Sequence, residues 1–180
     1  MHRRFLQLKL EHYSAHDTDE ARMLEQIMRF VDEYPDCFER NLKLGHITGS
    51  AWIIDHDRSH VLLTHHRKLD AWFQLGGHSD GDPDTFAVAL REGKEESGLS
   101  ELKPVSDHIF DVDVHLIPAR KDDPDHYHYD VRFLFEADRH APLTISSESK
   151  DLAWVSLDTA LGLSEDDSIR RMVAKSRILA

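Results

Sequence analysis

The chain has 180 residues, 40% of them hydrophobic and 31% charged, a composition typical of one soluble globular domain. Its formal net charge of -12 at pH 7 argues against generic nucleic-acid binding, because there is no basic stripe to displace counterions. No apolar run approaches the roughly 20 residues that span a bilayer, no signal core is present, and the one cysteine, Cys37, suits a reducing compartment. We therefore expect a cytoplasmic protein without membrane contact.

The N-terminal segment has a helical pattern. Asp17 or Thr18 can cap a helix whose apolar side chains recur at helical spacing, and Pro35 marks the end of that helix. We expect residues 1–44 to form a helical extension packed on a domain of residues 45–180. This extension either caps a sheet or contributes to a homodimer contact.

Strand and helix patterns alternate through the rest of the chain. Strands are predicted over residues 46–55, 60–64, 71–75, 109–117, 127–137 and 152–156, and helices over residues 84–97, 158–162 and 165–177. The first two strands flank a polar turn signal and are predicted to form a hairpin. Elements mixed in this order predict an α/β (α+β) fold, in which helices cover both faces of a mixed sheet.

The helix predicted over residues 84–97 follows a glycine-containing loop. Asp82 is the predicted N-cap, Pro83 suits the first helical position, and Gly98 supplies a left-handed C-terminal residue. Glycines at Gly76 and Gly77 allow a backbone to approach a ligand or a metal closely. The glycine loop therefore favours a ligand or metal site at the helix that follows it.

Three glutamates, Glu92, Glu95 and Glu96, project from one side of this helix, because their spacings are three and four residues. They repel one another unless they are solvated, paired with Arg91 and Lys94, or neutralised by a hard cation. An all-oxygen ligand set suits Mg²⁺ or Mn²⁺ better than Zn²⁺. The alternative is a solvated, charged helix face, which is the default for such a cluster in isolation.

The segment from Gly77 to Leu99 resembles the Nudix box, a signature that reads G, five residues, E, seven residues, R-E-U-x-E-E-x-G-U, with U aliphatic. Arg91-Glu92-Gly93-Lys94-Glu95-Glu96-Ser97-Gly98-Leu99 matches its second half, and the interval from Gly77 has no gap. Flanking Nudix-like elements extend the resemblance over about residues 45–162. The box departs at Pro83, where its first glutamate is expected, and at Gly93, where an aliphatic residue is usual.

The resemblance implies an α/β/α sandwich and a pyrophosphatase that hydrolyses the diphosphate bond of a small nucleoside diphosphate-linked substrate with Mg²⁺ or Mn²⁺. Glu92, Glu95, Glu96 and the carbonyl of Gly76 are the implied metal ligands. Glu92 is a ligand or a base, and Arg91 orients it through a charge-assisted hydrogen bond. For the missing box glutamate, the aspartates at positions 80, 82 and 84 are alternatives among which the sequence does not choose.

A further catalytic acid in this family often comes from a distal loop. Glu148, shortly before Trp154, resembles that element, and Glu136 and Asp151 are rivals. The alternative is a loop glutamate that is simply exposed.

Four further side chains are candidate substrate contacts: His78, Arg132, His128 and Trp72. Histidines that alternate on one strand can also form a second metal site, although solvent-facing histidines on an edge strand are the interpretation that we favour from sequence. Arg132 can bind phosphate or, more commonly, pair with a nearby acid. Trp72 can stack a nucleobase or pack in the core.

Two other functions remain open at this point. A sensor that binds a diphosphate ligand without turnover is kept open by Pro83. An isomerase of isoprenoid diphosphates on the same fold is a weaker alternative, because Cys37 lies outside the Nudix-like region.

Overall fold

The computed structural model describes residues 2–119, 124–164 and 166–179. The loop expected around residues 118–125 thus lies partly outside the described residues, and position 165, expected to be helical, lies wholly outside them. In chain order the elements are α1 (Arg4–Glu11), α2 (Thr18–Glu33), β1 (Gly45–Asp55), β2 (His60–His66), β3 (Ala71–Phe73), β4 (Leu75–His78), α3 (Thr85–Ser97), β5 (Lys103–Pro104), β6 (Asp111–Ile117), β7 (His126–Ala137), β8 (Ser149–Ser156), α4 (Leu157–Leu163) and α5 (Asp167–Ile178).

The sheet is mixed, as the sequence predicts. Among the described residues it has eight strands, in the order β3-β2-β1-β7-β5, with β4 paired to β1, β6 to β7 and β8 to β2. β1 and β7 are parallel, with Gly45 opposite Tyr127, whereas the other pairings are antiparallel. The predicted hairpin of β1 and β2 is confirmed, with Ile53 opposite Leu62.

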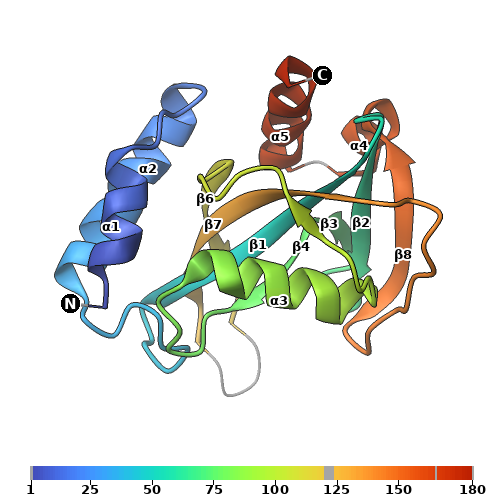
Figure 1. The fold of residues 1–180 in the computed structure, drawn as a ribbon. Helices are drawn as coiled ribbons and strands as arrows, with labels where there is room; N and C mark the ends of the chain where they lie inside the picture. Colours follow the sequence, from blue (N-terminus) through green and yellow to red (C-terminus); the bar gives the residue numbers. More distant parts are fainter. Residues whose placement is uncertain (1, 120–123, 165, 180) are drawn as a thin grey trace.

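Helices cover both faces of the sheet (Figure 1). On the face covered by α3, Ala89 shares a core cluster with Ala51 and Ile53 of β1. On the other face, Met172 of α5 shares a second cluster with Trp52. Neighbouring residues of β1 point to opposite faces, so this strand is buried along its whole length. The predicted sandwich with a mixed sheet is therefore confirmed.

Two N-terminal helices pack against the sheet. The side chain of Asp17 accepts hydrogen bonds from the N–H groups at positions 19 and 20, which confirms the predicted cap of α2, while α1 was not predicted as a separate helix. Ile27 and Phe30 of α2 lie in the same core cluster as Ile47 of β1. None of the helices in the described ranges is long and apolar enough to cross a membrane.

The glycine segment before α3 is a strand, not the expected loop. β4 pairs antiparallel with β1, and Gly76 lies opposite Ser50. A Cβ at Gly76 would overlap the Ser50 side chain, so the two strands approach this closely only because the residue is glycine. Pairing with a central strand fixes the backbone on which the candidate site is built.

α3 begins later than predicted. Its N-cap is Asp84, whose carboxylate accepts a hydrogen bond from the Ala87 N–H at 3.1 Å, so the capping role expected for Asp82 is corrected. Asp82 instead accepts from the Asp84 N–H at 2.9 Å in the preceding turn. Asp84 takes the cap because its carboxylate reaches a free N–H of the first helical turn. The predicted C-terminal role of Gly98 is confirmed by its φ of 72°.

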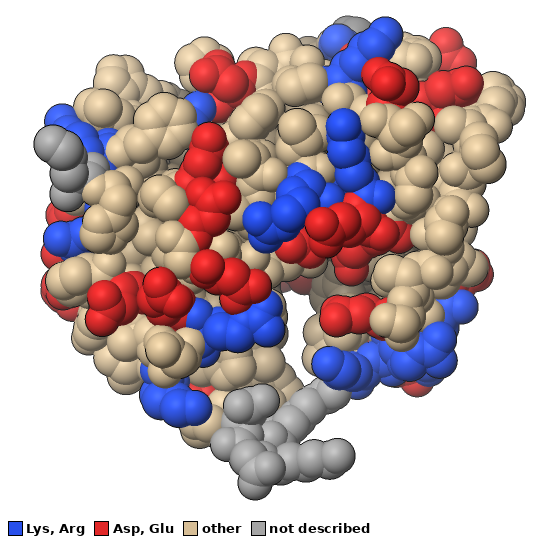
Figure 2. Space-filling view, turned by 60° about the horizontal axis from the view of Figure 1, so that its bottom comes forward, with Lys and Arg blue, Asp and Glu red and all other residues tan. Residues whose placement is uncertain are grey.

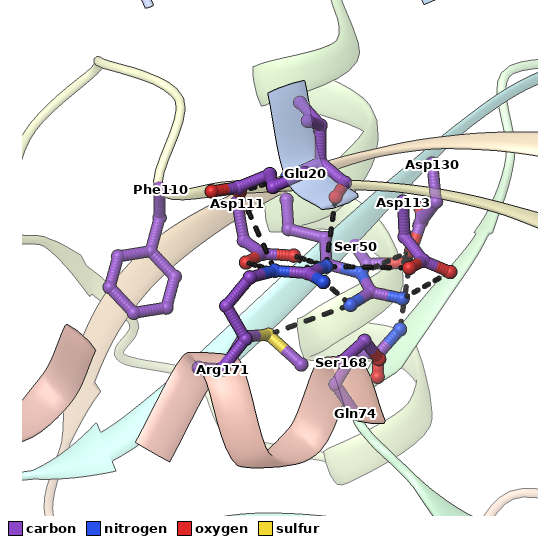
Figure 3. Close-up of polar contacts among 12 residues, drawn as sticks. Glu20, Ser50, Gln74, Phe110, Asp111, Asp113, Asp130, Ser168 and Arg171 are labelled. Atoms are coloured by element: carbon purple, nitrogen blue, oxygen red, sulfur yellow. Dashed lines mark hydrogen bonds and ion pairs between the residues drawn. The ribbon is translucent and has the colours of Figure 1, made fainter. Parts of the chain in front are cut away.

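A buried ionic network lies between the sheet and α5 (Figure 3). Arg132 contacts Asp130 at 2.7 Å, Asp111 at 3.2 Å and Asp113 at 3.3 Å. Asp111 in turn contacts Arg171 and Lys175, both at 2.8 Å. Charges this deeply buried are tolerated only when they are paired, so the network fixes α5 on the sheet.

Glu20 links α2 to the same network, and its carboxylate has no exposed surface. It contacts Lys175 and accepts a hydrogen bond from the Tyr13 hydroxyl at 2.5 Å. Burial alone would raise the pKa of Glu20, but the hydrogen bonds from Lys175 and Tyr13 outweigh it and lower that pKa from its ordinary value of 4.5 to about 2.

We expect Glu20→Gln to lower the free energy of unfolding at neutral pH by about 3 kcal/mol, because Lys175 then loses a buried partner. The contribution of a carboxylate with a lowered pKa is fully present above pH 4.5 and is lost as the pH falls toward 2. Urea unfolding of the parent and of Glu20→Gln should therefore give a difference in the free energy of unfolding that narrows as the pH falls below 4.5. Glu25→Gln, at an exposed position of α2, is the control. An undiminished difference at about pH 3 would contradict the assigned pairing.

Candidate active site

The helix that carries the three glutamates packs closely on the sheet. At the position where the box usually has an aliphatic residue, Gly93 is buried against Ala51 of β1. A Cβ at Gly93 would lie 3.0 Å from the Ala51 Cβ and 3.0 Å from Leu102 Cδ1. The departure at Gly93 therefore has a packing reason, since a larger residue fits between α3 and β1 only if its neighbours shift by a few tenths of an ångström.

Glu92 and Glu96 converge on the two glycines of β4. The Gly76 N–H donates a hydrogen bond to Glu96 Oε2 at 2.9 Å. The Glu92 carboxylate lies against Gly77, where an added Cβ would overlap it. Glu92 and Glu96 are half-buried, whereas Glu95 is exposed on the same helix. Two of the three predicted metal ligands thus lie beside the predicted backbone ligand at Gly76.

Both half-buried carboxylates hold protons more tightly than usual. Burial raises the pKa of Glu96, and although the Gly76 hydrogen bond opposes this effect, the charges of Glu92 and Glu148 add to it, so the pKa reaches about 7. Burial also raises the pKa of Glu92 against the effect of Arg91. Crowded oxygens with this property are the donor set that a hard divalent cation neutralises.

Arg91 holds Glu92 in place. Its guanidinium donates to Glu92 Oε1 at 3.0 Å and to the His78 carbonyl at 3.2 Å. The charge-assisted hydrogen bond expected between Arg91 and Glu92 is therefore present, and it also ties the helix to the end of β4.

The aspartates around Pro83 differ in what they contact. Asp80 forms an ion pair with Arg40, from the segment before β1, and its charge contributes to the raised pKa of Glu92. Asp82 and Asp84 are engaged in the turn and the cap of α3. Of the three aspartates considered as replacements for the missing glutamate, Asp80 is thus the one whose charge acts on the glutamate cluster.

Among the candidates for a distal acid, Glu148 lies within electrostatic reach of the glutamates. Its side chain is exposed, and its charge contributes to the raised pKa of Glu96. Glu136 instead pairs with Arg58 at 3.3 Å, near the turn between β1 and β2. Asp151 accepts a hydrogen bond from the N–H of Leu152, its neighbour in β8. Glu148 therefore remains the preferred candidate.

Two of the predicted substrate contacts have other partners. Arg132 is 1% exposed and holds three aspartates, which corrects its predicted contact with substrate: the guanidinium is committed to the buried network, the commoner alternative. Trp72 stacks on His65 with ring centroids 5.1 Å apart and an interplanar angle of 12°. One face of the indole is thus covered by the protein itself.

The histidines of β7 are not solvent-facing side chains of an edge strand. β7 lies between β1 and β6, so the interpretation favoured from sequence is corrected. His128 lies opposite His46, a buried residue that was not singled out because its parallel partner strand follows about eighty residues later. Burial, followed by the charges of neighbouring histidines, lowers the pKa of His46 to about 4 and that of His128 to about 2. Both imidazoles are therefore neutral at pH 7.

The surface on the α3 side of the molecule carries mixed charge. Figure 2 shows the lower side of Figure 1 turned forward: acidic and basic side chains lie in adjacent patches, and the surface is notched toward its lower edge. On this face, patches of both signs do not form the continuous basic track that a nucleic-acid backbone requires.

Comparison with known proteins defines the class. The family model described as the NUDIX domain matches residues 46–175, which is more than half of the chain. The chain therefore belongs to the Nudix hydrolase family. No curated protein sequence matches it.

Solved structures support the fold. A C. elegans Ap4A hydrolase in a binary complex aligns with a TM-score of 0.60 and 17% identity, covering 74% of this chain and 96% of that one. The E. coli dihydroneopterin triphosphate pyrophosphohydrolase aligns with a TM-score of 0.57 and 17% identity, covering 74% of this chain and 96% of that one. A MutT protein from Methanosarcina mazei aligns with a TM-score of 0.54 and 19% identity, covering 77% of this chain and 96% of that one. At these identities the similarity shows a shared fold.

Proposed function

We propose that this protein hydrolyses the diphosphate bond of a small nucleoside diphosphate-linked substrate, with Mg²⁺ or Mn²⁺ held by the α3 glutamates. The observation that carries the proposal is the convergence of Glu92 and Glu96 on the glycines of β4. Carboxylates gathered at one end of a fixed strand match the ligand preference of these cations.

The residues present fit such a cation. Glu92, Glu95, Glu96 and the Gly76 carbonyl would hold it, and when bound it would neutralise charge on the diphosphate and lower the pKa of an attacking water. Arg91 fixes the orientation of Glu92 through the 3.0 Å hydrogen bond. Glu148 is the proposed distal acid, because its charge already acts on Glu96.

The proposed class of substrate is suggested by the family and by the names of similar solved structures. The names of two of them specify Ap4A, a dinucleotide, and dihydroneopterin triphosphate as their substrates. The candidate substrates are ADP-ribose, dinucleotides and nucleotide sugars, and the sequence does not rank them. We assign the reaction to the cytoplasm. A homodimer through the N-terminal helical extension stays a prediction, which size-exclusion chromatography would test; α1 belongs to this extension, and its Phe5 is 51% exposed.

The experiment is a panel of dinucleotides, ADP-ribose, nucleotide sugars and nucleoside triphosphates, incubated with Mg²⁺, Mn²⁺ or chelator. A Glu95→Gln/Glu96→Gln variant, purified in parallel, controls for contaminating hydrolases. Cleavage that depends on the cation and is lost in the variant would support the proposal. Turnover that is equal in the variant or in chelator would overturn it.

A sensor without turnover is the second candidate, because Pro83 provides no carboxylate at the first glutamate position of the box. Saturable ligand binding without cleavage under both cations would favour it, and Pro83→Glu would then be the first substitution to test for restored turnover. The isomerase alternative is weakened further, since Cys37 is fully buried in the core and burial raises its pKa to about 12.

We expect Gly77→Ala to lower kcat/KM by roughly 10- to 100-fold, because the added Cβ overlaps the Glu92 carboxylate and displaces it. The end of a glutamate side chain is flexible, so the fold should tolerate the change and Tm should fall by only a few degrees, about the effect of 1 kcal/mol. Steady-state kinetics and thermal unfolding check both parts. Gly162→Ala, with open space around its Cβ, is the matched control. Full activity in Gly77→Ala would argue against a role for the Glu92 position.

A further inference from the structure

Five histidines meet on the sheet face opposite α3. In the pairing of the strands, His46 of β1 lies opposite His128 of β7, and His128 lies opposite His115 of β6. His78 of β4 lies opposite Thr48, two residues from His46, and His126 precedes His128 by two. Residues two apart on a strand share a face, so four strands, β1, β4, β6 and β7, contribute imidazoles to one place.

Three of these rings are close enough to share an ion. The ring nitrogens that His46, His78 and His128 can offer all lie within 4.8 Å of one another. Their ring centroids are 4.8 to 5.1 Å apart. A tetrahedral Zn²⁺ with Zn–N distances of about 2.05 Å places its donors about 3.4 Å apart, so the rings need to close by at most about 1.4 Å.

Three buried ring nitrogens of the cluster have no hydrogen-bond partner among the described residues. His46 is 2% exposed, and neither of its ring nitrogens has a hydrogen-bond partner among the described residues. Nε2 of His128 is buried and unpartnered in the same way. Buried polar atoms left unsatisfied cost about 1–3 kcal/mol each, and a metal ion that accepts the lone pairs removes part of that cost.

The neighbouring histidines are oriented as metal ligands usually are. Nδ1 of His126 contacts the Pro124 carbonyl at 3.0 Å, and since a carbonyl only accepts, Nδ1 is the donor and Nε2 is the nitrogen that can face a metal. Nδ1 of His115 contacts Asp113 Oδ2 at 2.9 Å. Ligating histidines commonly use a carbonyl or a carboxylate in this way to fix the ring. The His126 ring lies 5.1 Å from that of His46 and 5.3 Å from that of His128.

We infer that His46, His78 and His128 bind one Zn²⁺ ion, with His126 or a solvent molecule in the fourth position. Imidazole nitrogens favour transition metals over Mg²⁺, so this site and the glutamate cluster select different cations. The backbone of β4 separates the two sites, because Gly77 faces Glu92 on the α3 side whereas the adjacent His78 faces the opposite side. Zinc binding is independent of the proposed hydrolysis.

The test measures binding of Zn²⁺ itself. After treatment with chelator, the full-length protein is titrated with Zn²⁺ in the presence of excess Mg²⁺, and Co²⁺ is added in a parallel sample to record the visible absorption of a tetrahedral nitrogen site. We expect one Zn²⁺ per chain and a rise in Tm on loading. His78→Gln and His128→Gln should each raise the Kd by at least about 100-fold. The exposed His140→Gln should leave the Kd unchanged.

The Glu95→Gln/Glu96→Gln variant separates this inference from the proposed function, since it should keep the zinc site whether or not the protein is a hydrolase. Circular dichroism verifies that His78→Gln, whose side chain is only half-buried in the parent, is folded. Absence of stoichiometric zinc, an unchanged Kd in both histidine variants, or loss of zinc in the glutamate variant would overturn the assignment.

Discussion

Replacing Glu96 by glutamine should lower kcat/KM by about 10³-fold, which corresponds to about 4 kcal/mol of transition-state stabilisation. Glutamine keeps the shape of the side chain and an oxygen that can accept the 2.9 Å hydrogen bond from the Gly76 N–H. It removes the negative charge that would bind the cation. Initial rates measured across Mg²⁺ and Mn²⁺ concentrations would show whether the loss is partly recovered at high metal concentration, as expected for a weakened ligand.

Glu25→Gln provides the same chemical change at an exposed helical position and should leave the rates unaltered. Thermal unfolding of Glu96→Gln should show a stability close to that of the parent, because the carboxylate with the raised pKa loses a desolvation cost when it becomes neutral. An active Glu96→Gln protein, with less than a tenfold loss, would remove Glu96 from the metal site.

The largest effect on stability is expected from Arg132→Met, which should lower the free energy of unfolding by about 4 kcal/mol. Methionine fills much of the same volume but removes the cation that Asp111, Asp113 and Asp130 share in a buried site, while Arg171 still pairs with Asp111 and Asp113. For a chain of this size, a loss of that magnitude should lower Tm by about 10 °C. Calorimetry or thermal circular dichroism would measure it directly.

Arg22→Met is the matched control, because Arg22 forms an ion pair with Asp19 at 3.0 Å in which both side chains are 71% exposed. An exposed pair contributes about 0–1 kcal/mol, so its removal should scarcely move Tm. Equal shifts in the two variants would show that the buried network contributes no more than a surface pair.

The parts of the fold that depend on local sequence could be predicted. The cap at Asp17, the glycine terminus of α3 at Gly98 and the hairpin of β1 and β2 all follow from short patterns, and each is present. The glutamate cluster was equally accessible, because its spacing on a helix is fixed by helical geometry.

Features set by distant pairings could not be predicted in the same way. Gly76 and Gly77 have the composition of a loop, and only the partner strand β1 makes them part of β4. The role of His46 depends on the parallel pairing of β1 with β7, which no local pattern reveals. Arg132 likewise acquired three carboxylate partners from β6 and β7, and the sequence could offer the ion pair only as one of two alternatives.

The shared core of α2 and β1 has a practical consequence for anyone who expresses this protein. The family match starts at residue 46, yet Ile27 and Phe30 are buried against the same cluster as Ile47, and the Ile47 N–H donates to the Cys37 carbonyl at 2.7 Å. A fragment trimmed to the match would expose an apolar surface to water and release Asp80 from Arg40. The family match and the shared core therefore begin at different residues, and we expect a clone trimmed to the match to be less stable than the whole chain.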